Sequence, residues 1–337
     1  MGGFAMNKKA IIGLSVFAAI TLVCGVSLIA DRTAIEGKSI IKFEPKHEYK
    51  VSGDWLYVDS TAGTNCPAEK GEIFVYGYIG SDKEITIPSE LDDQPVTGIS
   101  WHMADYCYNY VDSSNKGYEK VKKVTVPESV KSLGSGSLGF PNLETLVFEE
   151  GFRTDEKQGS DWLGSASTNV KSITLPESFA LSDNYKAETA KFGWWSDQTK
   201  VNKKKEDLAS NDLVIKCAKG SWGEKFARKN NFCYKYTGKV SKKAVPAPAY
   251  NRQMKVSKKA IVIKWHKNSN TDGYKLYQRK DGEWKVIKTL KGAGKTKYKV
   301  KGLKSKKVYK FKIKAYKKIK GKTYYSPASN TIKIKTK

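Results

Sequence analysis

The sequence EITIPS at residues 84–89 returns as VTVPES at 124–129 and as ITLPES at 173–178, with LVFEEG at 146–151 as a weaker copy. Each copy alternates a β-branched residue or Leu with Thr or Val and then stops at Pro or Gly. This pattern is typical of a short strand that faces a core on one side and ends in a turn. Because the copies recur along one chain, they predict a repetitive architecture with one strand per copy.

The spacing of the copies predicts coils of unequal length. One residue of each copy takes the equivalent inward-facing position: Ile85, Val124, Leu146 and Ile173. The intervals between them are 39, 22 and 27 residues, so the shortest is a single coil and the others are a coil with an insertion. The segments 96–107 and 130–144 also match each other and predict the return side of each coil. We expect their apolar residues to stack in one continuous core: Ile99, Leu133, Leu138, Phe140 and Leu143.

At these residues the chain resembles the BspA-like group of leucine-rich repeats, a class found in bacterial surface proteins. The group's consensus reads roughly ItIPxsVtxIGxxAFxxCxxLxxV. Residues 74–100 are similar to its opening segment, and Cys107 matches the Cys that often ends a coil. Residues 213–236 resemble its closing unit, with a short helix from about residue 222 to 229 between two strands. The resemblance covers roughly residues 51–237. It implies a mainly β solenoid of short parallel strands with irregular return segments, a Gram-positive source and an adhesion or partner-binding role.

Two features of the repeat region follow from this resemblance. In the closing unit the two strands would bring Cys217 and Cys233 near each other, which allows a disulfide, and two separately buried thiols are the alternative. The repeat pattern is interrupted by an insertion at 180–211, which contains adjacent Trp194 and Trp195 beside a Lys run. These rings could stack on a sugar or bind a partner. The alternative, which we favour, is that they fold back over the core.

The charge of the chain is concentrated in its C-terminal quarter. The whole chain has 61 Lys+Arg against 34 Asp+Glu, a net charge of +27. Residues 251–337 hold 29 of the basic residues, 27 of them Lys, and three acidic residues, a net charge of +26. The first 250 residues are therefore nearly neutral, and a partner attracted by charge would meet the C-terminal module.

This module follows a linker at 238–250, in which two Pro residues favour extended backbone. Alternating runs then recur every 10–15 residues: 260–265, 273–279, 284–290, 297–303, 308–316 and 330–335. Such spacing predicts a small antiparallel β-sandwich. Trp265, the Gly302-Leu303 pair and Tyr309 resemble the fibronectin type III domain, which implies that Tyr309 is its tyrosine corner.

Period-2 geometry predicts which cations share a face of the sandwich. If the apolar residues at 309–315 point inward, the alternate Lys residues point outward. The candidate polyanion-binding residues on this face are Lys275, Arg279, Lys310, Lys312, Lys314, Lys333 and Lys335. Lys297, Lys299 and Lys301 would cover the opposite sheet, so the module is basic nearly all round.

This distribution favours diffuse attraction to anionic polymers, such as wall polymers or glycosaminoglycans, over a shaped pocket. The excess of Lys over Arg argues against nucleic acid, because bidentate recognition of phosphates and bases tends to recruit Arg. A solvated surface that only maintains solubility is the alternative.

The N-terminus predicts export. Lys8 and Lys9 precede an uncharged, mostly apolar run at 10–30, which fits a cleaved signal peptide or an uncleaved signal anchor. Either would leave the rest of the chain outside the membrane, secreted or associated with the cell surface. The predicted domains are a signal segment at 1–30, a linker at 31–50, the repeat domain at 51–237, the linker at 238–250 and the basic sandwich at 251–337.

The sequence contains no recognisable catalytic, cofactor-binding or metal-binding pattern. His47, His102 and His266 lie far apart and none neighbours a Cys. GSGSLG at 134–139 satisfies a nucleotide-binding pattern but lies inside a repeat. We therefore expect a monomeric, non-enzymatic protein that meets a protein or glycan partner through its repeats. The alternative is an accessory or carbohydrate-binding subunit of an extracellular enzyme.

Overall fold

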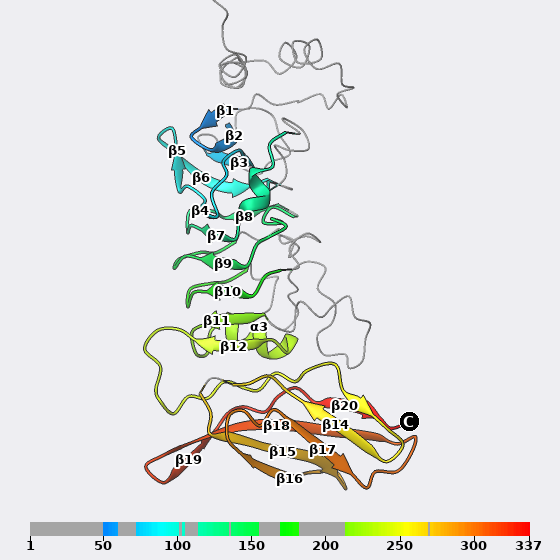
Figure 1. Cartoon of the computed structure of the whole chain (residues 1–337). Coiled ribbons are helices and arrows are strands. Elements are labelled where there is room, and N and C mark those ends of the chain that lie inside the picture. Colours follow the sequence, from blue (N-terminus) through cyan, green and yellow to red (C-terminus); the bar gives the residue numbers. More distant parts are fainter. Residues whose placement is uncertain are drawn as a thin grey trace, which may run out of the picture.

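The computed structural model describes residues 50–59, 72–100, 103–104, 114–134, 136–154, 169–181, 213–268 and 270–337. These residues form a stack of short strands that ends on a β-sandwich (Figure 1). Within the described ranges no helix is long and apolar enough to cross a membrane. The predicted signal segment at 10–30 lies outside them.

The middle of the described chain is a sheet of parallel strands that follow one another in chain order. They are β4 (Glu84–Thr86), β7 (Lys123–Val126), β9 (Thr145–Phe148), β10 (Ser172–Leu175), β11 (Val214–Cys217) and β12 (Cys233–Tyr236). The register pairs the predicted equivalent residues in turn: Ile85, Val124, Leu146 and Ile173. The alignment of the repeats made from the sequence is therefore confirmed residue by residue.

The core of the stack is built from one or two buried residues per strand and from the return segments. The five residues predicted to stack there are at most 3% exposed. A row of rings continues this core along the stack. Phe152 stacks on Phe179 at 5.5 Å between centroids, and Phe179 lies 5.1 Å from Trp222. Because each ring contacts a ring of the next coil, the coils stabilise one another.

A second sheet covers the first coils. Its strands are β1 (Lys50–Ser52), β2 (Trp55–Asp59), β3 (Ile73–Tyr78), β5 (Glu90–Leu91), β6 (Gln94–Ile99) and β8 (Ser132–Leu133). The first three strands are antiparallel, whereas β6 pairs in parallel with both β3 and β8. The short 3₁₀ helix η2 (Gly117–Lys120) lies before β7.

The closing unit has the predicted order of strand, turn, helix and strand. Helix α3 (Trp222–Asn230) begins after Ser221, whose side chain accepts a hydrogen bond from the backbone N–H of Glu224. The Glu224 carboxylate in turn accepts the N–H of Gly220 at 2.8 Å. This reciprocal arrangement is close to a capping box and explains why the helix begins here. The helix ends at Asn231, which adopts the left-handed conformation with φ of 61°.

The sandwich contains two antiparallel sheets around a separate core. One sheet has β13 (Lys255–Val256), β14 (Ala260–Lys264) and β17 (Lys297–Lys301). The other has β16 (Glu283–Lys291), β15 (Gly273–Lys280), β18 (Val308–Ile319) and β19 (Lys322–Tyr325), with β20 (Ile332–Lys335) paired to β18. All six predicted runs are strands, while β13 and β19 were not predicted. The Tyr309 hydroxyl accepts the N–H of Lys304 at 2.7 Å, as expected for the predicted corner.

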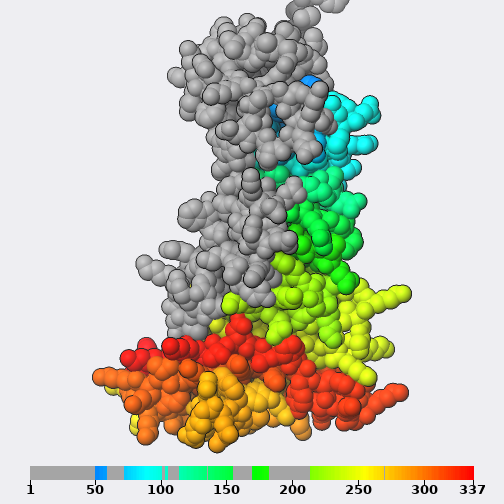
Figure 2. Space-filling view, turned by 180° about the vertical axis from the view of Figure 1, so that it is seen from behind, coloured from blue at the N-terminus to red at the C-terminus, as the bar shows by residue number. Residues whose placement is uncertain are grey.

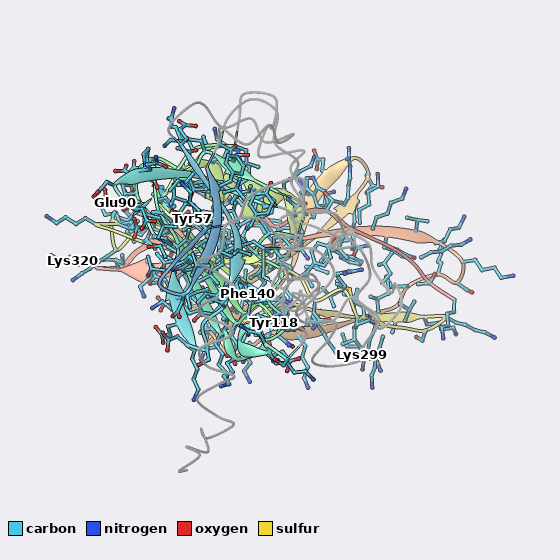
Figure 3. The ribbon with its side chains drawn as sticks, turned by 90° about the horizontal axis from the view of Figure 1, so that it is seen from above. Tyr57, Glu90, Tyr118, Phe140, Lys299 and Lys320 are labelled. Atoms are coloured by element: carbon cyan, nitrogen blue, oxygen red, sulfur yellow. The ribbon has the colours of Figure 1, made fainter. Side chains whose placement is uncertain are left out.

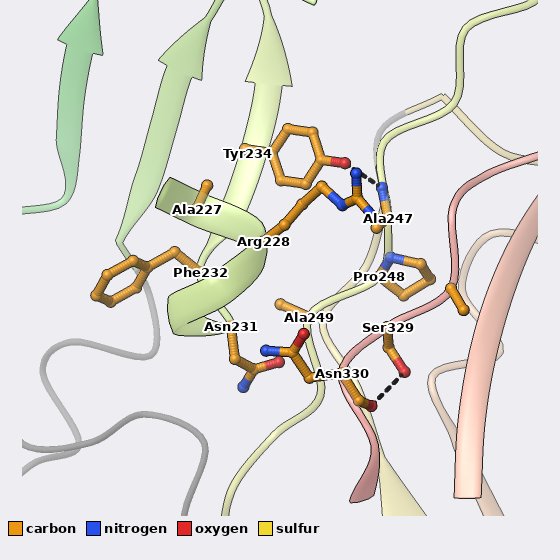
Figure 4. A pocket seen from close by; sticks show the side chains of 11 residues that line it. Ala227, Arg228, Asn231, Phe232, Tyr234, Ala247, Pro248, Ala249, Ser329 and Asn330 are labelled. Atoms are coloured by element: carbon orange, nitrogen blue, oxygen red, sulfur yellow. Dashed lines mark hydrogen bonds between the residues drawn. The ribbon is translucent and has the colours of Figure 1, made fainter. Parts of the chain in front are cut away.

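The second half of the predicted linker at 238–250 packs against its neighbours, because residues 244–250 are buried. Asn231 at the end of α3 donates from Nδ2 to the carbonyl of Tyr250 at 2.9 Å, and its Oδ1 accepts the N–H of Tyr250 at 3.0 Å. The Tyr234 hydroxyl accepts the N–H of Ala247 (Figure 4). The small apolar residues of this segment fit between the stack and the sandwich, so they form an interface instead of a spacer.

Side chains of the sandwich also donate hydrogen bonds to the backbone of residues 244–250. Asn268 donates from Nδ2 to the carbonyl of Pro246 at 2.6 Å, and Asn270 donates to that of Ala244 at 2.7 Å. Asn330 reaches the carbonyl of Lys229 at the end of α3 at 2.9 Å. Seen along the stack, the sandwich extends beyond it on both sides, with Lys320 and Lys299 at its margins (Figure 3). The junction therefore fixes how the sandwich projects from the stack.

We predict that Asn231→Gly loosens this junction. Gly retains the left-handed backbone but removes both side-chain hydrogen bonds to the buried backbone of Tyr250. The expected cost is about 1–3 kcal/mol in the free energy of unfolding. Urea denaturation and limited proteolysis within 238–250 measure it, with Lys229→Ala as an exposed neighbouring control. Equal cleavage rates for Asn231→Gly and the unaltered chain would contradict the described junction.

Candidate functional site: the lysine face of the sandwich

The seven predicted cations lie on the outer surface of the larger sandwich sheet, which we call the lysine face. Lys275 of β15 lies directly opposite Lys314 of β18, and Lys310 of β18 opposite Lys333 of β20. Lys312 and Lys335 continue the same alternation, and Arg279 pairs with Trp284 on β16. The predicted grouping of these side chains on one face is thus confirmed.

Aromatic rings lie among these cations, and the sequence interpretation did not assign them a role. The Nζ of Lys275 lies 4.7 Å from the centroid of the Tyr325 ring, and the Nζ of Lys312 lies 4.7 Å from that of Trp284. Lys314 lies 5.9 Å from the ring of Tyr277. These are cation–π distances, so the rings hold the three ammonium groups in place. The sequence hides this role for Trp284, because strict alternation on β16 gives it the parity of the core-packed Leu290, and only a bulge in the pairing with β15 turns it outward.

A hydrogen bond adds to one of these pairs. The Tyr325 hydroxyl, as a hydrogen-bond partner of Lys275, raises the pKa of that ammonium above its usual value. Burial acts in the opposite direction but is the smaller effect. Lys275 is therefore cationic at neutral pH.

The lysine face also carries exposed apolar side chains. In the described part of the chain, the exposed large hydrophobic residues are Val286 at 47%, Val308 at 50% and Tyr325 at 44%. All three belong to this face, because their cross-strand partners are Tyr277, Lys335 and Tyr316. A solvent-exposed face that combines rings, branched apolar groups and cations is typical of a recognition surface.

At one end of the lysine face, Gly273 lets the Tyr316 side chain lie close to the backbone of β15. Tyr316 lies opposite Gly273 and its hydroxyl donates to the carbonyl of Leu290 at 3.4 Å. A Cβ at Gly273 would lie 2.6 Å from that hydroxyl and 2.2 Å from the carbonyl oxygen, so only glycine fits there. The ring of Tyr316 thereby lies across β15 and contacts the ring of Tyr325 at 6.3 Å.

The lysine face has little negative charge to balance it. Of the three acidic residues of 251–337, Asp272 accepts the backbone N–H of Lys318, and Glu283 lies 3.8 Å from Lys285 at an exposed edge. Asp281 lies in a turn between β15 and β16. Like charges directly opposite one another destabilise a sheet. The pairs of Lys275 with Lys314 and of Lys310 with Lys333 would therefore be stabilised by an external anion.

The smaller sheet is also cationic but has a different surface. Lys297, Lys299 and Lys301 are exposed on β17, as predicted. Tyr298 between them packs against the core of the sandwich. Among the described residues of this sheet, Ala260 and Val262 lie opposite these lysines on the outward side, which has no outward-facing ring.

The prediction of a disulfide between Cys217 and Cys233 is wrong, because no disulfide joins them. The parallel register places Cys233 opposite Val214 and Cys217 opposite Tyr236. The two Cys are thus three ladder positions apart, about 10 Å along the strands, which exceeds the reach of a disulfide of about 7 Å between Cα atoms. Burial raises the pKa of the Cys217 thiol to about 12, while Cys233 lines an open cleft of about 230 Å³ at the junction.

Two other expectations concern sites. Trp194 and Trp195 lie outside the described residues. Across the ranges that the structure describes, no group of three His, Cys, Asp or Glu side chains could hold a metal ion.

The family model of the fibronectin type III domain matches residues 246–332. This part of the chain is a fibronectin type III domain, and it begins five residues before the predicted boundary at 251. The residues that pack against α3 therefore belong to the domain itself. No curated protein matches the chain.

Solved structures resemble about a third of the chain or less. A fibronectin type III domain of human fibronectin type III domain containing protein 3 is 22% identical, with a TM-score of 0.24, over 30% of this chain and 91% of that one. The FN1-FN3 domains of chicken CNTN1 are 23% identical, with a TM-score of 0.23, over 27% and 31%. A β-1,2-glucanase from Parabacteroides distasonis is 22% identical, with a TM-score of 0.24, over 28% of this chain and 13% of that one.

We predict that Cys217 and Cys233 behave as independent thiols. In the native protein at about pH 8, iodoacetamide should alkylate Cys233 well before Cys217, because Cys217 is buried and its thiolate is disfavoured. In urea both should react. Peptide mapping without reductant measures this, and recovery of a cross-linked peptide joining the two residues would overturn the assignment.

Proposed function

We propose that this protein is an exported, non-enzymatic binding or adhesion protein, secreted or associated with a bacterial cell surface. Its fibronectin type III domain would be attracted to anionic polymers of the wall or of a host matrix. Its strand stack would present a surface to a protein or glycan partner. The observation that carries this proposal is the convergence of seven cationic side chains on one sheet face that lacks balancing acids.

We also propose that residues 51–237 are a BspA-like leucine-rich repeat solenoid. Support comes from the strands of successive copies, which pair in parallel and in the register that the repeated sequence predicts. The closing helix over Trp222–Asn230 and the strands that flank it add to this support. Such stacks expose an extended surface, which suits recognition of a large partner.

The arrangement of the two parts suits a surface protein. Strand β1 lies at one end of the stack, and the sandwich lies at the other (Figure 1). Seen from behind, the sandwich forms the base of the molecule (Figure 2). If the apolar run at 10–30 anchors the chain, the stack would lie between β1, the first described strand, and the cationic domain, which could meet polymers outside the membrane.

The charge of the domain predicts a steep dependence of binding on salt. The full chain should bind immobilised heparin or isolated bacterial wall in about 50 mM salt and lose at least about tenfold in affinity by about 300 mM, because exposed charges are screened. A neutral dextran matrix serves as control. Affinity for anionic polymers that is absent, or that is the same at both salt concentrations, would refute the proposal.

A further inference from the structure

We propose that the lysine face is a defined binding site for an anionic polysaccharide, a chain of sugar rings that carries carboxylate or sulfate groups. The inference rests on the proposed function. It adds which of the two cationic sheets binds and which class of polymer it takes. Diffuse attraction, predicted from the all-round charge, would treat both sheets alike.

The first argument is that the cations of this face are held in position. Lys275, Lys312 and Lys314 each lie over an aromatic ring at 4.7–5.9 Å from its centroid. A Lys side chain usually loses much conformational freedom when it binds, and holding it beforehand reduces that cost. Neighbouring strands are about 4.8 Å apart and alternate residues about 6.7 Å apart. The face therefore offers a fixed lattice of positive charge to a chain with closely spaced acidic groups.

The second argument is the apolar surface between the cations. Val286 and Tyr325 are exposed on this face, and Trp284 is partly exposed two residues from Val286 on β16. The C–H faces of a sugar ring can pack on such side chains, and Trp and Tyr provide large contact areas with little conformational freedom to lose. A polyphosphate or a polyol phosphate has no ring to place there. Charge and apolar contact together favour a polymer of charged sugars.

The third argument separates this site from one for nucleic acid. The fibronectin type III domain has two Arg residues, and Arg252 is 1% exposed in the core. Arg279 is thus the single guanidinium that the domain can present on the lysine face. Readout of base edges relies mainly on the bidentate hydrogen bonds of Arg, Asn and Gln, whereas Lys meets an anionic group as a point charge and carries little base specificity.

The smaller sheet provides a matched control within the same domain. Lys297, Lys299 and Lys301 are as numerous as the three ring-held lysines, and they are exposed on β17 without rings between them. Replacing either set by Gln changes the net charge equally. Any difference between the two variants therefore reports on the surface around the lysines and not on the total charge.

The experiment uses the full chain with heparin and polygalacturonate as polysaccharides, and polyphosphate and single-stranded DNA as other polyanions. Affinities are measured at about 100 mM salt after circular dichroism confirms folding. The triple variant Lys275→Gln, Lys312→Gln, Lys314→Gln should lose at least about tenfold in affinity for both polysaccharides. The variant Lys297→Gln, Lys299→Gln, Lys301→Gln should lose no more than about threefold.

A second variant tests the contribution of the apolar surface. Trp284→Thr combined with Tyr325→Thr keeps residues that favour strands and leaves the charge unchanged. We expect a loss of about fivefold or more on polysaccharides and a clearly smaller loss on polyphosphate, which loses the positioning of Lys275 and Lys312 but no ring contact.

The possible failures are distinguishable. Equal losses for the two triple variants would overturn the defined site and leave the proposed attraction to polyanions standing. An equal effect of the ring variant on polyphosphate, or tighter binding of DNA than of either polysaccharide, would overturn the assignment to charged sugars. No binding of the unaltered chain to any polyanion would refute both the site and the proposed function.

Discussion

The architecture depends on one constraint: a short parallel strand cannot bury its apolar side alone. Each coil presents an inward residue, such as Val124 or Leu146, that becomes buried only when the neighbouring coils are in register. Rings such as Phe152 and Phe179 tie adjacent coils at their edge. A stack of this kind must also be closed at both ends. The sheet that begins with β1 covers one end, and α3 with the sandwich covers the other.

At the closing unit, a series of hydrogen bonds links the stack to the sandwich. Glu224 caps the start of α3 and accepts the hydroxyls of Tyr234 and Tyr236 at 3.3 and 3.0 Å. The Tyr234 hydroxyl then accepts the N–H of Ala247. Burial raises the pKa of both Tyr residues, which keeps their hydroxyls protonated as donors. Together with Asn231 at the other end of the helix, these groups hold the fibronectin type III domain on the stack.

Because the sandwich is packed against the stack, its cationic faces have fixed positions relative to the stack. Nearly all net positive charge belongs to one domain, and within it the two sheets differ in what lies between the lysines. On the larger sheet, rings such as Trp284 hold ammonium groups and leave apolar surface exposed. On the smaller sheet Tyr298 contributes to the core instead. A domain that is basic on all sides can thus still have one face suited to binding.

The sequence by itself determined the repeat register, six strands of the sandwich and the outward parity of residues such as Lys312. These follow from alternation along single strands, a local property that two-residue periodicity fixes. The tertiary structure alone decided that Cys217 and Cys233 stand apart, that residues 244–250 are buried and that Lys275 meets Tyr325. Each of these depends on which distant segments become neighbours and in which register. Periodicity within one strand carries no information about either.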